Sequence, residues 1–194
     1  MSEQVLLLLL GFLLTTVVGG LLGFYFQTRT WDSNRRESEL QAAAAVFDDL
    51  SRILDRRLYR MRQLNWRLSS ADKAQIEDAM ASYRQSVLEW NENLNRNLAL
   101  TYGYFGVRTW DYLDKTIFED FVSLGRDIEK RYESWHKGDV NDSAARIEGR
   151  LDAVSDKLYN LNRFMIALVQ AGEVGLYQSR AETWPEEAPW QTDQ

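Results

Sequence analysis

Residues 142–170 read DSAARIEGRLDAVSDKLYNLNRFMIALVQ, and this stretch decides the fold. Its apolar residues follow one another at alternating steps of four and three: Ile147, Leu151, Val154, Leu158, Leu161, Met165 and Leu168. An α-helix with this spacing carries one apolar stripe, and sustained spacing of this kind is typical of helices that pack at a shallow angle. The stretch therefore predicts one helix of a helical bundle.

Three further stretches have apolar residues at helical spacing, and none shows the alternation typical of β-strands. They cover residues 33–68, 71–102 and 108–137, separated by short turns at 69–70 and 102–106, and Gly138 ends the last. Short turns make neighbouring helices antiparallel. We therefore expect an all-α fold, in which a single N-terminal transmembrane helix is followed by a long antiparallel, coiled-coil-like four-helix bundle.

The composition excludes several functional classes. The chain has 194 residues, a net charge of −6 and no cysteine. Without cysteine there are no disulfides, thiolate metal sites or cysteine nucleophiles, and the negative charge disfavours a nucleic-acid partner. The sequence also lacks a Walker loop, a dinucleotide-binding glycine pattern and a nucleophile elbow. We expect neither a cofactor nor a metal.

A transmembrane helix is expected near the N-terminus, because residues 5–26 carry no charge. Twenty-two helical residues rise about 33 Å, close to the thickness of a bilayer's hydrocarbon core. Arg29, Arg35 and Arg36 follow the span, whereas Glu3 precedes it. The positive-inside rule then places the N-terminus outside and the remaining chain in the cytoplasm, as in a single-pass protein of a bacterial inner membrane. The lipid bilayer is the first expected partner.

The domain boundaries follow from this prediction. We expect a short N-terminal segment over residues 1–4, the transmembrane helix over 5–26, a cytoplasmic helical bundle over 27–181 and a disordered acidic tail over 182–194. The tail contains both prolines of the chain. Proline and acidic residues at a chain end are typical of a segment without fixed structure.

Gly11, Thr15, Gly19 and Gly23 recur every four residues within the apolar segment. Small residues at this spacing share one helix face and let a second helix approach closely. The ridge predicts a homo-oligomer or a partner membrane helix.

An arginine-rich segment is the first candidate interaction surface. It contains Arg52, Arg56, Arg57, Arg60, Arg62 and Arg67, against Asp55 as the one acid in the same stretch. One interpretation is a solvated face that pairs with acids of other helices, such as Glu77 and Asp78. The other is a docking surface for an acidic protein partner or an RNA backbone.

Two asparagines, Asn91 and Asn97, lie on or beside the apolar stripe of the second predicted helix. We expect both amides to be buried or half-buried. A buried amide must find hydrogen-bond partners, and its best-attested use is to fix helix register or oligomeric state. A functional pocket is the alternative.

The single histidine, His136, follows Arg131 in the stretch Arg131-Tyr132-Glu133-Ser134-Trp135-His136. This spacing resembles the R-x4-H signature of HEPN ribonucleases, which are also helical bundles. The resemblance implies a dimer-interface site where the histidine acts in acid–base chemistry and the arginine steadies a phosphate. It covers these two residues and the general fold class, and Tyr132 stands where that family usually has a polar residue.

The leading functional hypothesis is therefore non-enzymatic: a membrane-anchored scaffold or adaptor that self-associates or docks a protein partner on the cytoplasmic side. A second hypothesis is a HEPN-like, membrane-anchored effector that cuts RNA with Arg131 and His136. A third is a membrane-perturbing oligomer, which the wholly apolar span disfavours because it offers few polar groups to line a pore.

Overall fold

The structure, a computed structural model, describes residues 3–70, 72–139 and 143–175. Within the helices, the side chains of residues 3–11, 13, 14, 32 and 70 are not part of the description, and the predicted tail over 182–194 lies outside it. The chain divides into two units, Met1–Glu39 and Leu40–Gln194. Each unit is described by itself below.

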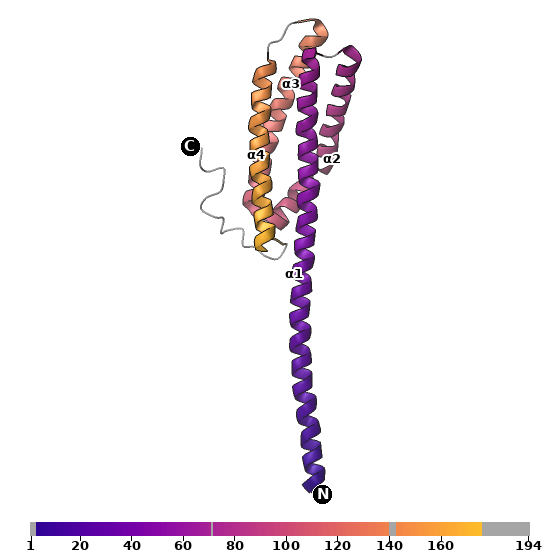
Figure 1. The fold of residues 1–194 in the computed structure, drawn as a ribbon, viewed down its shortest axis with the longest axis vertical. Coiled ribbons are helices and arrows are strands. Elements are labelled where there is room, and N and C mark those ends of the chain that lie inside the picture. Colours follow the sequence, from indigo (N-terminus) through magenta and orange to yellow (C-terminus); the bar gives the residue numbers. More distant parts are fainter. Residues whose placement is uncertain (1–2, 71, 140–142, 176–194) are drawn as a thin grey trace, which may run out of the picture. The chain divides into compact units, whose positions relative to one another are not determined.

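The described residues form five helical elements and no strand. They are α1 (Glu3–Ser70), α2 (Lys73–Tyr112), the π-helix η1 (Leu113–Phe118), α3 (Glu119–Lys137) and α4 (Ala144–Ala171). The predicted all-α class is confirmed. The order of the elements along the chain is shown in Figure 1.

The predicted division into four bundle helices is not what forms. Instead of a loop over residues 102–106, one residue interrupts α2: Gly106 has φ 83° and ψ 172°, and the helix continues to Tyr112. η1 then adds a stretch of wider π-helical turns before α3 begins. One glycine suffices for the break because this backbone conformation is essentially open to glycine alone. No sequence pattern announces a π-helix, so η1 was not predicted.

The helix ends have recognisable caps. The Asp72 side chain accepts a hydrogen bond from the backbone N–H of Gln75, so Asp72 is the N-cap of α2. Gly138 and Gly172 adopt left-handed conformations at the ends of α3 and α4. These caps satisfy backbone groups that a helix terminus leaves without partners.

In the second unit, paired side chains give the direction of each helix relative to its neighbour. Along α1, Ser51 bonds Asn162 and Arg62 bonds Asp152, so α1 and α4 run antiparallel. The pairs Arg56–Glu89 and Arg67–Gln75 make α1 and α2 antiparallel in the same way. Figure 1 shows α2, α3 and α4 beside this part of α1.

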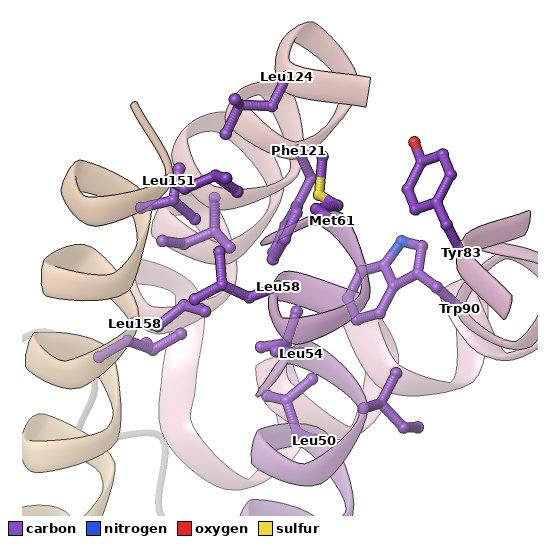
Figure 2. Close-up of a cluster of buried hydrophobic side chains, with 14 of the residues drawn as sticks. Leu50, Leu54, Leu58, Met61, Tyr83, Trp90, Phe121, Leu124, Leu151 and Leu158 are labelled. Carbon is purple, nitrogen blue, oxygen red and sulfur yellow. The ribbon is translucent and has the colours of Figure 1, made fainter. Parts of the chain in front are cut away.

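The core of the second unit is built from the predicted apolar stripes. On α4 the stripe residues from Ile147 to Met165 are at most 3% exposed, as the 3-4 spacing predicted. In Figure 2, Leu54, Leu58 and Met61 of α1 lie between Phe121 and Leu124 of α3 and Leu151 and Leu158 of α4, while Tyr83 and Trp90 extend from α2. Burial of each large aliphatic or aromatic side chain contributes about 1.5–3 kcal/mol.

The first unit is helical from residue 3 to residue 39, as the N-terminal part of α1. Where its side chains are described, most are exposed, including Phe12, Leu21, Phe24 and Trp31. Three threonine hydroxyls donate to the backbone carbonyl four residues earlier: Thr16 to Phe12, Thr28 to Phe24 and Thr30 to Phe26. These hydroxyls are satisfied within the helix, so the segment presents few unused polar groups.

The predicted transmembrane helix over residues 5–26 is contradicted. Over the described part of the chain, no helix combines the length and the hydropathy that crossing a membrane requires. The continuous stretch of described apolar side chains covers residues 15–26, and 12 helical residues rise about 18 Å, against about 30 Å of hydrocarbon.

The membrane topology falls with the span. The predicted single-pass arrangement, with the N-terminus outside and the C-terminal domain in the cytoplasm, depended on that helix. All three functional hypotheses also placed the protein in or on a membrane: the anchored scaffold, the anchored ribonuclease and the membrane-perturbing oligomer. Each is corrected for the same reason, since none of the described helices can span a bilayer.

Candidate functional site

The arginine-rich segment of α1 is largely paired within the protein. Arg56 bonds Glu89 of α2 at 2.7 Å, and Arg62 bonds Glu148 and Asp152 of α4. The other exposed members have partners too: Arg52 with Asp49, Arg60 with Gln63, and Arg67 with Gln75. The segment therefore holds α1 against its neighbours, and the acids it uses differ from the predicted Glu77 and Asp78.

Arg57 differs from the other arginines because it is buried, with 3% of its surface exposed. Its guanidinium carbon lies 4.8 Å from the centre of the Phe121 ring. Its Nε and Nη1 atoms are buried and have no hydrogen-bond partner among the described residues. Burial lowers the pKa of Arg57, since desolvation penalises the charged form. Its cation–π contact offsets only about 2 kcal/mol of a desolvation cost of several kcal/mol.

Polar groups of α2 face the same part of the core. Tyr83 is 2% exposed, and burial raises the pKa of its hydroxyl, while the nearby Arg57 charge opposes that shift. The indole Nε1 of Trp90 is buried without a partner, and its ring stacks with Phe118 at 6.2 Å between centroids. Figure 2 shows Tyr83 and Trp90 on the same side of α2. This region supplies hydrogen-bond donors in excess of acceptors.

Arg131 occupies a second buried position, near the C-terminal end of α1. Its Nη1 donates to the backbone carbonyl of Asn65 at 2.6 Å and to the Asn65 side-chain oxygen, and Nη2 donates to the Ser69 hydroxyl at 2.7 Å. The Asn65 amide in turn donates to Ala144 and Glu148 of α4. Arg131 and Asn65 thus join α1, α3 and α4 at one point. The sequence analysis missed Asn65, since no pattern links it to an arginine 66 residues away.

His136 does not share this environment. The residue is exposed, and its ring stacks on Tyr132 at 6.2 Å. Arg131 is 5% exposed and holds the end of α1. The pair that resembled the HEPN signature is therefore divided between the interior and the surface, and Arg131 would have to leave its hydrogen bonds to reach a phosphate.

The two asparagines of α2 also separate. Asn97 is 6% exposed, and its Nδ2 has no hydrogen-bond partner among the described residues. Asn91 is exposed, so the expected burial does not extend to it. The two residues are six positions apart, and six steps of about 100° turn Asn91 well away from the face that carries Asn97.

Asn97 lines a cavity of about 80 Å³ between α1 and α2. The other lining residues are Ala45, Val46, Asp49, Leu50, Arg96 and Leu100. Asp49 is bonded to Arg52, whereas no partner for Arg96 is found among the described residues. The cavity is thus mainly apolar, with a buried amide and a cation at its edge.

The glycine ridge of the first unit is open. An added Cβ at Gly19 or Gly23 would meet no atom within 4 Å. Thr15 is exposed, and Gly11 belongs to the part of α1 whose side chains lie outside the described residues. Nothing in the chain itself therefore uses this face.

Larger apolar side chains form a second face of the same helix. Val17, Leu21, Phe24, Thr28 and Trp31 follow one another at steps of four and three. At 100° per residue they lie within about 40° of one direction, and Phe26 points the opposite way. We call these five residues the apolar seam. Its members Val17, Leu21, Phe24 and Trp31 are 51%, 66%, 71% and 75% exposed.

No cluster of three or more histidine, aspartate or glutamate side chains suited to one metal ion occurs among the described residues. No known protein family, curated protein or solved structure matches this chain.

Proposed function

We propose that this protein is an assembly module that pairs with a second copy of itself through the apolar seam of α1. The single observation that carries the proposal is the exposure of large apolar side chains along a helix that offers no polar face between residues 15 and 26. A helix that is apolar all round is a buried helix in ordinary proteins. Since no described helix spans a membrane, a second protein surface is the remaining cover.

The exposed area is sufficient for a stable interface. Nine large apolar residues between Phe12 and Trp31 are exposed by 47% to 75%. Taking about 200 Å² for each side chain, they present on the order of 1,000 Å² of apolar surface. A stable protein interface buries about 800 Å² per partner, so pairing with one copy accounts for most of this surface.

The seam is a better interface than the glycine ridge on the opposite face. Leucine, phenylalanine and tryptophan remove far more apolar area from water than glycine does, at about 25 cal/mol per Å². The 3-4 spacing of the seam also matches the knobs-into-holes packing of a two-stranded coiled coil. Charged residues begin at Arg35, which pairs with Glu39 on the helix surface, so the seam ends before them.

In this proposal the second unit is a helical bundle that the paired helices carry. Its four helical segments, with α2 folded at Gly106, alternate in direction and share one core. Self-association would then place two such bundles at defined positions, which is what a scaffold provides.

The test is the double substitution Leu21→Glu and Phe24→Glu, with Phe26→Glu as the matched control on the opposite face. We expect the double variant of the full chain to be monomeric by light scattering, because two carboxylates in each seam face two more in the partner. Phe26→Glu should keep the mass of the wild type.

Three outcomes would contradict the proposal. Equal loss of assembly in both variants would mean that no face is specific. Dissociation by Gly19→Ile, with the seam variant still associated, would assign the interface to the glycine ridge. Wild-type protein that binds lipid vesicles and stays monomeric without them would show that lipid, and not a second copy, covers this helix.

A further inference from the structure

The cavity between α1 and α2 in the second unit has polar groups that the proposed assembly does not use. Its walls are the apolar side chains of Ala45, Val46, Leu50 and Leu100, and two donors of α2 accompany them, Asn97 within and Arg96 at the surface. Asn97 is more than nine-tenths buried, yet its Nδ2 finds no acceptor in the protein.

An unpaired buried amide N–H costs about 1–3 kcal/mol, so native proteins rarely keep one without a reason. The amide lies in a cavity of about 80 Å³. By comparison, a cavity of roughly 150 Å³ holds benzene, so this cavity has room for a chain of two to four carbon or oxygen atoms. A ligand of that size with an acceptor group would satisfy the amide.

The charges at the cavity favour an anionic acceptor. Arg96 is exposed, and no acid is found paired with it among the described residues, so its guanidinium is available for a charge-assisted hydrogen bond. Asp49 is the one lining acid, and Arg52 already pairs with it at 2.7 Å. Asn97 and Arg96 are neighbours in the chain and both donate, which suits the two oxygens of a carboxylate.

We infer that this cavity binds a short-chain carboxylate. The carboxylate oxygens accept from the Asn97 amide and the Arg96 guanidinium, and the aliphatic end of the ligand packs against Val46, Leu50 and Leu100. The site lies wholly within the second unit and is independent of the pairing through the apolar seam.

The test uses sodium acetate, propionate and butyrate with the full chain at constant ionic strength. We expect the side-chain amide resonances of Asn97 to shift in a saturable manner in ¹H–¹⁵N spectra, while those of Asn91, an exposed amide on the same helix, do not. Sodium chloride at the same concentration should cause no such shift.

Two variants assign the chemistry. Arg96→Gln removes the cation from an exposed position and should weaken carboxylate binding at least tenfold, since a hydrogen bond to a charged group contributes about 1.5–3 kcal/mol. Asn97→Asp keeps the shape of the side chain but replaces the donor with a like charge, and should abolish binding. Asn91→Leu is the control and should bind as the wild type does.

The inference is overturned if the Asn97 resonances do not respond to any of the three carboxylates at concentrations up to 0.1 M. It is also overturned if Arg96→Gln binds them as tightly as the wild type. Because Arg96 is exposed, that variant keeps its fold even if Asn97→Asp does not.

Discussion

At the residue scale, two buried arginines are treated in opposite ways by the same core. Arg131 has three hydrogen bonds to the end of α1, whereas Arg57 has two buried nitrogens without a partner. Burying a charge is unfavourable unless polar partners replace its water. The two residues therefore make opposite predictions for substitution by an apolar side chain.

Arg57→Met should raise the free energy of unfolding by about 1–3 kcal/mol, because methionine keeps the packing on Phe121 and removes an unpaired buried charge. Urea denaturation of the wild type and the variant measures the difference. A loss of stability of more than about 1 kcal/mol would show that the guanidinium has a favourable partner in solution.

Asn65→Leu should lower the free energy of unfolding by about 2–3 kcal/mol, because it removes the side-chain acceptor of a buried guanidinium. Adding Arg131→Met should restore much of this loss, since a donor without an acceptor is then no longer buried. Asn91→Leu, at an exposed amide, should change stability by at most about 0.5 kcal/mol. Losses that simply add in the double variant would argue against the coupling of Asn65 and Arg131.

The residues of the candidate sites were predictable only in part. The apolar stripe placed Asn97 in the interior, but it did not show that the amide lacks a partner. The same composition that suggested an arginine surface did not show that Arg57 faces inward, since burial depends on the helix rotation against three neighbours. Such outcomes depend on contacts between residues far apart in the chain.

At the element scale, the fold of the second unit depends on how α2 reverses. Gly106 is the one residue inside α2 with non-helical backbone angles, and only glycine adopts φ 83° with ψ 172° without strain. Sequence reasoning found the region, through its glycines and aromatics, but predicted a five-residue loop. Apolar periodicity predicts helix faces well, whereas it does not reveal how few residues a break requires.

Gly106→Ala should lower the free energy of unfolding by about 1–3 kcal/mol through backbone strain. Gly149→Ala is the matched control, because Gly149 lies inside α4 and an added Cβ there meets nothing within 4 Å. The control should gain about 0.5–1 kcal/mol, since alanine favours the helix. Thermal or urea unfolding of the two variants gives both values, and equal effects would contradict the role assigned to Gly106.

At the scale of the whole molecule, the two units have opposite relations to water. The second unit buries its apolar stripes in one core, whereas the described part of the first unit exposes them along a single helix. The sequence analysis recognised this apolar segment and assigned it to a bilayer. The described side chains form too short a stretch for that, and their 3-4 spacing along the seam leads to a second protein chain as the partner.

The central claim, that the chain assembles through this seam, is tested most directly by sedimentation equilibrium of the full-length protein in buffer without detergent or lipid. The chain has a mass of 22.6 kDa, and we predict that the measured mass approaches twice this value as the concentration rises through the micromolar range. A mass of one chain at every concentration would contradict the account.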